Sequence, residues 1–262
     1  MRDLRVTLVQ QALVWEDPVA NRENLARVLH AAKLQTDLIL LPEMFTTGFS
    51  MNAEANGEPA GGETQDWLQS QARIFDCAIA GSVATRDHGG VFNRLLFATP
   101  DRVETYDKRH LFRMAGEHNH YASGNKRVVL EWRDWRIKPE ICYDLRFPVF
   151  SRNRDDYDLL FFVANWPSAR AHHWRALLQA RAIENLACVV GVNRVGVDGN
   201  ALEYSGDSMA FDQHGSVLLD LGSHAAVETV CFSAAALMDY RDAFPTALDA
   251  DRFTVELEAV GE

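Results

Sequence analysis

Strand-like apolar runs and helical apolar repeats alternate along the chain. Residues 4–14 alternate apolar and polar positions, and residues 38–41 form an apolar run that ends at a proline, so both predict strands. Between them, Asp17 and Pro18 supply an N-cap and a first-turn proline for a helix that continues to about Ala32. The same criteria predict a short helix capped by Thr64, helices at 171–186 and 234–240, a hairpin at 127–142, and strands at 77–85, 91–99, 102–107, 158–165, 187–195, 208–213, 216–221 and 227–232.

Buried strands mixed with amphipathic helices are typical of an α/β fold, in which helices cover a sheet core. The chain has 262 residues and contains no repeat, low-complexity tract or long linker. A polar, glycine-rich loop is predicted at about 48–63. We therefore expect a single domain that spans residues 1–262.

The charge balance limits the range of partners. Lys and Arg number 26 against 37 Asp and Glu, which gives a net charge of −11. Nucleic acids and anionic membranes require basic surfaces, so neither is an expected partner. No apolar run approaches the roughly 18–20 residues of a membrane span, and the first residues lack the apolar stretch of a signal peptide. We expect a soluble, cytoplasmic protein.

Polar residues end three of the predicted buried strands. Glu43, Cys142 and Asn165 each stand at such an end. Ligands of α/β folds bind beyond the carboxyl ends of strands, so these three side chains are expected to share one cleft. This placement alone does not identify a chemistry.

Cys142 and Glu43, together with Lys108, form a set that could carry out acyl transfer. A thiol at the entrance to a helix, near cations, has a lowered pKa and is nucleophilic. A buried carboxylate can act as a general base, and an ammonium group can stabilise an oxyanion. Each residue also has an ordinary structural interpretation, as a core cysteine, a solvated loop glutamate and a surface lysine. The residue types alone leave both interpretations open.

Three motifs, taken in order, resemble those of the carbon–nitrogen hydrolase (nitrilase) superfamily. They are Leu-Pro-Glu43, Tyr-x-Lys108-x-His-Leu-Phe and Ile-Cys142-Tyr-Asp-Leu-Arg-Phe-Pro. Each motif is weak alone, but the three together in a chain of this length are specific. Met-Phe-Thr-Thr-Gly-Phe, Phe-Arg-Met-Ala-Gly-Glu-His and Val-Ala-Asn-Trp-Pro are most similar to bacterial omega-amidases. Those enzymes act on the ω-amides of 2-oxo acids, such as 2-oxoglutaramate.

The resemblance implies an α/β fold of the nitrilase type, a four-layer α-β-β-α sandwich. It implies Glu43 as general base, Lys108 as oxyanion donor and Cys142 as nucleophile. The backbone N–H of Tyr143 is then the second oxyanion donor. The family's second active-site glutamate lies seven residues before a glycine, a spacing that selects Glu117; its alternative interpretation is a mobile, exposed loop residue.

The sequence departs from the family pattern in the strand that leads to the cysteine. Lys138, Pro139 and Glu140 stand where family members usually have apolar or small residues. By the period of two, Glu140 is on the same strand face as Cys142. A third carboxylate near the thiol would raise the thiol's pKa. The sequence leaves open whether Glu140 points into the site or towards a subunit boundary.

A substrate that carries a carboxylate requires a fixed cation near Cys142, and arginine binds carboxylates in bidentate fashion. The candidates are Arg113, Arg146 and Arg170, of which Arg113 and Arg170 rank ahead because Arg146 could simply brace Glu43 or a helix. We expect Asn165, Trp166 and His173 to line or support the same pocket.

No cofactor or metal is expected. His118-x-His120 and His172-His173 lack a carboxylate or cysteine at ligand spacing, and neither a phosphate loop nor a dinucleotide motif is present. The four cysteines form no CxxC pair.

The leading hypothesis is a thiol amidohydrolase that releases ammonia from short linear ω-amides through a thioester. Its alternatives are another amide or carbamoyl-amide hydrolase of the superfamily, or a non-catalytic nitrilase-like binding protein. The resemblance also implies a homodimer or larger homo-oligomer, in which helices near Cys142 and near 171–186 meet across a two-fold axis.

Overall fold

The computed structural model describes residues 1–257, and these residues form two mixed β-sheets packed face to face. The first sheet has seven strands: β1 (Leu4–Gln10), β2 (Leu38–Leu40), β3 (Glu58–Pro59), β4 (Ala78–Asp87), β5 (Gly90–Ala98), β6 (Val103–Asp107) and β15 (Ala226–Phe232). The second has six: β7 (Leu130–Trp132), β8 (Trp135–Ile141), β9 (Leu159–Ala164), β10 (Cys188–Asn193), β13 (Met209–Phe211) and β14 (Val217–Asp220). The predicted strands are confirmed, with shifts of one to four residues at most ends.

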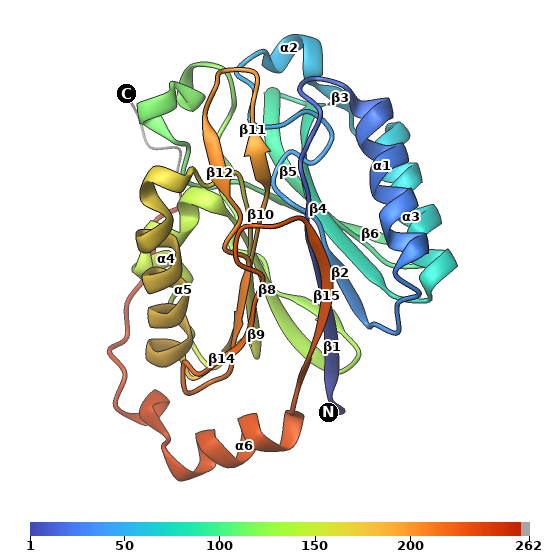
Figure 1. Cartoon of the computed structure of the whole chain (residues 1–262). Helices are drawn as coiled ribbons and strands as arrows, with labels where there is room; N and C mark the ends of the chain where they lie inside the picture. Colours follow the sequence, from blue (N-terminus) through green and yellow to red (C-terminus); the bar gives the residue numbers. More distant parts are fainter. Residues whose placement is uncertain (258–262) are drawn as a thin grey trace.

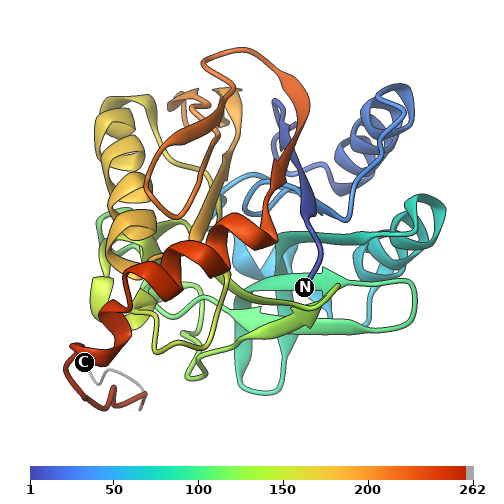
Figure 2. The same cartoon turned by 90° about the horizontal axis from the view of Figure 1, so that it is seen from below.

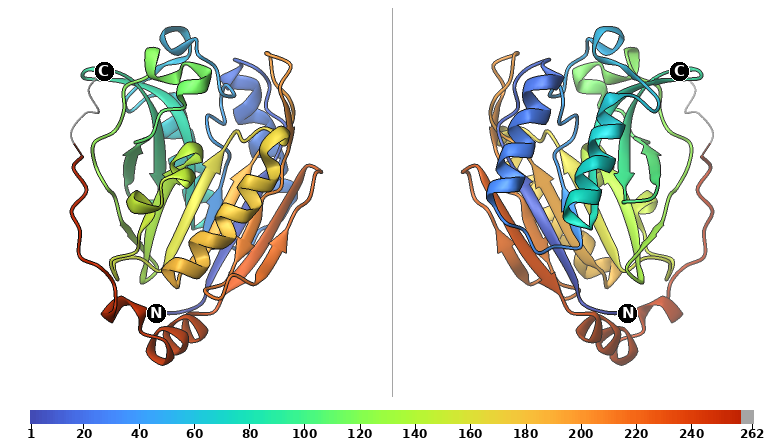
Figure 3. Two further views of the ribbon diagram at one scale, coloured as in Figure 1. Left: turned by 90° about the vertical axis from the view of Figure 1, so that its left-hand side faces the viewer. Right: turned by 90° about the vertical axis from the view of Figure 1, so that its right-hand side faces the viewer.

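Helices cover the outer face of each sheet, which gives the four layers that the resemblance implied (Figure 1). On one side lie α1 (Pro18–Ala31) and α3 (Glu63–Phe75), and on the other lie α4 (Pro148–Ser151) and α5 (Ala171–Asn185). The short helix α2 (Ala53–Asn56) lies in the loop predicted at 48–63. Figure 2 shows α6 (Ala234–Ala243) lying across the end of the sandwich that holds the N-terminus. In Figure 3 the segment after α6 runs back along the outside of the molecule.

The apolar run at 38–41 shows how the sequence specifies these layers. Leu38 and Leu40 pack in the core between the two sheets, whereas Ile39 and Leu41 pack in the core beneath α1 and α3. Successive side chains of a strand point to opposite faces. A strand with a core on both faces must therefore be apolar at every position.

Parallel strands at the centre of each sheet direct the chain towards the same end of the molecule. β1, β2 and β4 are parallel neighbours in the first sheet, and β8, β9 and β10 are parallel neighbours in the second. The carboxyl ends of β2, β8 and β9 precede Glu43, Cys142 and Asn165. These ends meet where ligands of α/β folds bind.

Two local expectations differ from the structure. Thr64 does not cap its helix, because α3 begins at Glu63 after Gly62, and the Thr64 hydroxyl instead donates to Glu58. The hairpin of β11 (Val195–Val197) and β12 (Glu203–Ser205) was not predicted, because its strands are short and only partly buried. Among residues 1–257, no helix has the length and apolar character needed to cross a bilayer.

Candidate active site

Glu43, Lys108 and Glu117 form a buried cluster at the carboxyl ends of the strands. The Lys108 Nζ donates to Glu43 Oε1 at 2.8 Å and to Glu117 Oε1 and Oε2 at 3.1 and 3.0 Å. All three side chains have no exposed surface. Glu117 begins a 3₁₀ turn, η2 (Glu117–Asn119), and also accepts a hydrogen bond from the Phe112 N–H at 2.6 Å. It is therefore a fixed residue of the cluster and not an exposed loop glutamate.

The opposite charges of this cluster stabilise one another against the cost of burial. Burial opposes the ammonium form of Lys108, but the carboxylates of Glu117 and Glu43 outweigh this effect and raise the pKa of Lys108 above its usual value. Burial raises the pKa of Glu117, while Lys108 opposes that shift. Lys108 is thus a permanent cation at neutral pH, with both acidic neighbours within hydrogen-bond distance.

Asn93 joins the two carboxylates and was missed by the sequence analysis. It lies on β5 with no exposed surface. Its Nδ2 donates to Glu43 Oε1 at 2.8 Å and to Glu117 Oε1 at 3.2 Å. A polar residue inside a buried strand was the available signal, since such residues need a partner.

Cys142 stands at a strained backbone position directly after β8. It begins the 3₁₀ turn η3 (Cys142–Arg146) and has a φ of 44°, a left-handed conformation that is uncommon for residues other than glycine. Its Sγ donates weakly to the Asn165 carbonyl oxygen at 3.9 Å. Strained positions of this kind persist where the surroundings impose them, and they cluster at active sites.

The pKa of the thiol differs from the expectation. Burial raises the pKa of Cys142 well above its usual value, and the adjacent Glu43 raises it further against the opposing effect of Lys108. The expected lowering at a helix entrance is therefore wrong for this buried site. A raised pKa favours the neutral thiol form of Cys142.

A hydrogen-bond network beneath the turn fixes its shape. One carboxylate, that of Asp144, accepts from the Ile141 N–H at 3.0 Å, the Tyr106 hydroxyl at 2.7 Å and the His110 N–H at 2.9 Å. The His110 Nδ1 lies 2.7 Å from the same carboxylate. These partners come from β6, β8 and the loop after Lys108, so the turn is attached to both sheets.

Asn165 connects the second sheet to Glu43. Its backbone N–H donates to Glu43 Oε2 at 2.8 Å, and its Nδ2 donates to the Glu43 carbonyl oxygen at 2.6 Å. The glutamate is therefore oriented by groups from both sheets. Glu43, Cys142 and Asn165 therefore lie side by side at the strand ends, as expected, although Glu43 is buried behind the other two.

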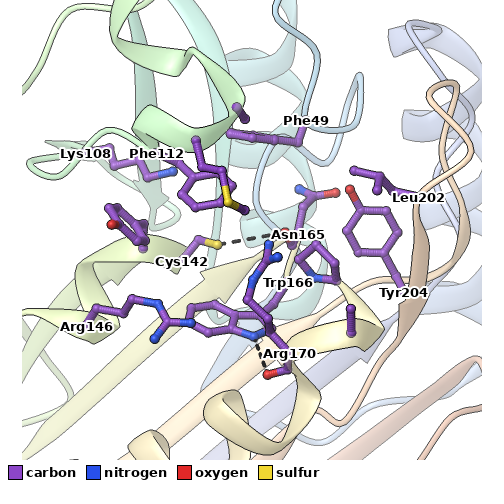
Figure 4. A pocket seen from close by; sticks show the side chains of 15 residues that line it. Phe49, Lys108, Phe112, Cys142, Arg146, Asn165, Trp166, Arg170, Leu202 and Tyr204 are labelled. Atoms are coloured by element: carbon purple, nitrogen blue, oxygen red, sulfur yellow. Dashed lines mark hydrogen bonds between the residues drawn. The ribbon is translucent and has the colours of Figure 1, made fainter.

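A cavity of about 260 Å³ opens over Cys142, and Figure 4 shows the side chains around it. Cys142, Lys108 and Asn165 lie among its lining residues. Most of its wall is apolar or aromatic, formed by Phe49, Phe112, Met114, Trp166, Leu202 and Tyr204. A small molecule with a short apolar middle section fits such a wall.

Arg113 and Arg170 were expected to lie nearer the substrate than Arg146, but the structure places Arg146 and Arg170 at the cavity and Arg113 outside it. Arg146 and Arg170 line the cavity, and Arg146 lies over the Trp166 ring at 4.8 Å and 3.0 Å from His173 Nδ1. Arg170 lies 5.4 Å from the centre of the Phe112 ring. Arg113 is exposed on the 3₁₀ turn η1 (Arg113–Ala115) and is absent from the lining. A solvent-facing turn position could not be recognised from the spacing alone.

A model of the carbon–nitrogen hydrolase family matches residues 5–240. The chain belongs to the carbon–nitrogen hydrolase family. It is 50% identical over 255 residues to omega-amidase YafV of Escherichia coli (strain K12), covering 97% of this chain and 99% of that relative. It is 31% identical over 228 residues to a 2-oxoglutaramate amidase of Bacillus subtilis (strain 168), covering 85% and 88% of the two chains.

A solved structure of the same superfamily agrees closely with the fold. It is a protein from Xanthomonas campestris, crystallised with an arsenic adduct in its active site, and it is 51% identical to this chain. The TM-score is 0.95, with 97% of this chain and 100% of that chain covered. The nitrilase-type fold that the sequence predicted is thereby confirmed.

In this carbon–nitrogen hydrolase, Glu140 is not part of the cavity. It is fully buried, but its carboxylate accepts from the Ser151 Oγ at 2.7 Å and pairs with Lys138 at 2.9 Å. The side chain therefore points towards α4 and not into the site. Within residues 1–257, no group of three His, Cys, Asp or Glu side chains is arranged to hold a metal ion.

Proposed function

We propose that this chain is an omega-amidase, a thiol amidohydrolase that releases ammonia from linear ω-amides of 2-oxo dicarboxylic acids. The observation that carries the proposal is the buried cluster of Glu43, Lys108 and Glu117 beside Cys142, at the base of a small cavity. The relatives named for omega-amidase and 2-oxoglutaramate amidase activity support it. We also propose that residues 1–262 act as one domain.

The proposed reaction begins with attack of the Cys142 sulfur on the amide carbon. Glu43 accepts the thiol proton as the carbon–sulfur bond forms, so a thiol with a raised pKa is deprotonated in the same step in which it attacks. The oxyanion is stabilised by the Lys108 ammonium and by the backbone N–H of Tyr143. Glu43 then returns the proton to the leaving nitrogen, and ammonia departs as the thioester forms.

Hydrolysis of the thioester completes the cycle. Glu43 removes a proton from water, the hydroxide attacks the acyl carbon, and the proton passes to the departing sulfur. Glu117 binds Lys108 through both of its oxygens, so its proposed role is to hold that cation towards the cavity. The acid is released and the neutral thiol is restored.

We further propose that Arg146 and Arg170 bind the substrate carboxylate. Glu43 and Glu117 would repel an anion, so a cation must compensate at the far side of the cavity. Both arginines lie against aromatic rings, Arg146 on Trp166 and Arg170 on Phe112, which restricts the guanidinium planes. Of the three sequence candidates, these two meet the requirement of lining the cavity.

Ammonia release from 2-oxoglutaramate and from a neutral amide of the same length tests this assignment. Arg146→Ala and Arg170→Ala are each expected to raise KM for the charged amide by about 10- to 100-fold, since a hydrogen bond to a charged group contributes about 1.5–3 kcal/mol. The neutral amide is expected to change little. The exposed Arg113→Ala serves as the matched control.

Two results would redirect the proposal. Equal losses for charged and neutral amides in both arginine variants would contradict carboxylate recognition and leave another amide or carbamoyl-amide as the substrate. No ammonia release from any amide, with an unreactive Cys142, would instead favour a nitrilase-like binding protein.

We also propose a homodimer formed through α4, α5 and the segment after α6. Large apolar side chains are exposed there, among them Val149 on α4, Ile183 on α5, and Phe244 and Leu248 after α6. Ile183→Asp is expected to shift a sedimenting dimer to monomer at micromolar concentration, because it places a charge in the interface. Val19→Asp, at a similarly exposed position on α1, is the control. A wild-type chain that sediments as a monomer would contradict the dimer.

The cytoplasm is the proposed working compartment. All four cysteines are free thiols, which is the usual state in a reducing compartment.

A further inference from the structure

The strand that leads to Cys142 buries two opposite charges that the proposed mechanism does not use. On β8, the Lys138 Nζ lies 2.9 Å from Glu140 Oε1, and neither side chain has any exposed surface. Burial lowers the pKa of Lys138 and raises that of Glu140, so the site itself disfavours both charges. Neither residue lines the cavity.

The pair connects the chain before the strained turn to the chain after it. The Glu140 carboxylate accepts from the hydroxyl of Ser151, the last residue of α4, at 2.7 Å. The Lys138 ammonium lies 4.3 Å from the centre of the Phe150 ring, also on α4. The backbone of Ser151 is fixed in turn, because its carbonyl oxygen accepts from the Tyr157 hydroxyl at 2.6 Å.

The turn between these two points has a conformation that must be held. Cys142 has a φ of 44°, and such a residue keeps its conformation only when its surroundings over-determine it. Asp144 holds the turn from within, through the Ile141 N–H and the Tyr106 hydroxyl. The hydrogen bond from Ser151 to Glu140 joins the strand before the turn to the helix after it, so it holds the two ends of the turn together.

We propose that Lys138 and Glu140, acting through Ser151, are positioning residues that hold the Cys142 turn so that the thiol faces Glu43 and the cavity. The inference rests on Cys142 being the nucleophile, as proposed above. In this role Lys138 orients the Glu140 carboxylate, and the carboxylate fixes the start of the turn relative to α4.

A purely stabilising role would not require these residue types. A buried ion pair is expensive to desolvate, and apolar residues of similar volume often support a fold equally well or better. What the apolar pair lacks is a directional acceptor for Ser151. Stability and thiol placement can therefore be separated by experiment.

The decisive variant is Lys138→Leu/Glu140→Leu in the full chain. It is expected to fold with a Tm close to that of the wild type, because no buried charge is left unpaired. Its kcat for 2-oxoglutaramate is expected to fall about tenfold or more, with KM within about twofold, because small displacements of a reacting group cost up to about 100-fold. The rate at which iodoacetamide alkylates Cys142 is expected to fall in parallel.

Two further variants test the direction of the effect. Lys138→Met/Glu140→Gln keeps an acceptor for the Ser151 hydroxyl and is expected to recover part of the lost kcat and alkylation rate. Ser151→Ala keeps both charges but removes the link, so it is expected to lower both rates, and it decides the question if the leucine variant does not fold. Thr7→Val, which breaks a partly buried hydrogen bond between β1 and β15, controls for lost stability alone.

Wild-type kcat and alkylation rates in both the leucine variant and Ser151→Ala would overturn the proposal and leave the pair a structural element only. The alkylation rate requires no substrate, so it reports thiol placement even if the ω-amide assignment is wrong. Failure of the ω-amide assignment would appear separately, as a wild-type enzyme that releases no ammonia from 2-oxoglutaramate, and failure of the nucleophile assignment as amide turnover that survives Cys142→Ala.

Discussion

Cys142→Ala is expected to lower ammonia release from ω-amides by at least about 10³-fold while the fold is retained. Removal of a nucleophile leaves only binding and oxyanion stabilisation, and these cannot replace a covalent intermediate. Alanine keeps a Cβ, so it meets the same backbone requirement at a φ of 44° as cysteine does. Steady-state ammonia assays together with thermal unfolding measure the two effects.

The other cysteines provide the control for this variant. Cys231 is exposed and distant in sequence from every site residue, so Cys231→Ala is expected to retain full turnover. Peptide mapping after brief treatment with iodoacetamide is expected to find Cys142 alkylated first, because Glu43 can accept its proton. More than a tenth of wild-type activity in Cys142→Ala would refute the nucleophile assignment.

Glu43→Gln is expected to lower kcat by about 10²- to 10⁴-fold, the range typical of a lost general base. Glutamine preserves the volume, and its one carbonyl oxygen can still accept from Lys108 Nζ in the place of Oε1. Its NH2 group replaces Oε2, so it cannot accept from the Asn165 N–H or take up the thiol proton. A pH effect accompanies the loss. Because the Glu43 carboxylate adds to the effect of burial in raising the pKa of Cys142, its neutral replacement lowers that pKa.

Alkylation of Cys142 measured against pH tests the sign of this effect. The midpoint of the profile is expected to move to lower pH in Glu43→Gln, even though turnover is lost. Glu63→Gln, at an exposed position on α3, is the matched control and is expected to leave both measurements unchanged. A variant with wild-type kcat would exclude Glu43 as the base.

The residues that the sequence places correctly are those fixed by strand ends. Glu43, Cys142 and Asn165 each follow an apolar run, and the carboxyl ends of parallel strands lie together. Lys108 follows β6, which is antiparallel to its neighbour and is not an apolar run, and Glu117 lies on a 3₁₀ turn, so only their resemblance to family motifs identified them. In the structure, the Lys108 ammonium donates to both Glu43 and Glu117, so these two residues lie in one cluster with Glu43.

Other features depend on packing that no local pattern encodes. Asn93 approaches both carboxylates only because β5 lies beside β4 and β6 in the first sheet. Arg146 reaches the cavity and Arg113 does not, although both stand near predicted active-site residues. The Glu140 side chain points towards α4 because the hydroxyl of Ser151, at the end of that helix, donates to it. Such contacts join residues that are distant along the chain, so they become visible only in three dimensions.

The hydrogen bonds between Glu43 and Asn165 also have a consequence for how the molecule folds. The two residues are 122 positions apart, and each belongs to a different sheet. Contacts of such long sequence separation form late, because a large loop must close before they can contribute. Glu43 and Lys108 follow strands of the first sheet, Glu117 lies on a turn between the sheets, and the thiol follows a strand of the second, so neither sheet alone contains a working site. Recovery of activity after refolding would therefore report the docking of the two sheets, and not the formation of either one.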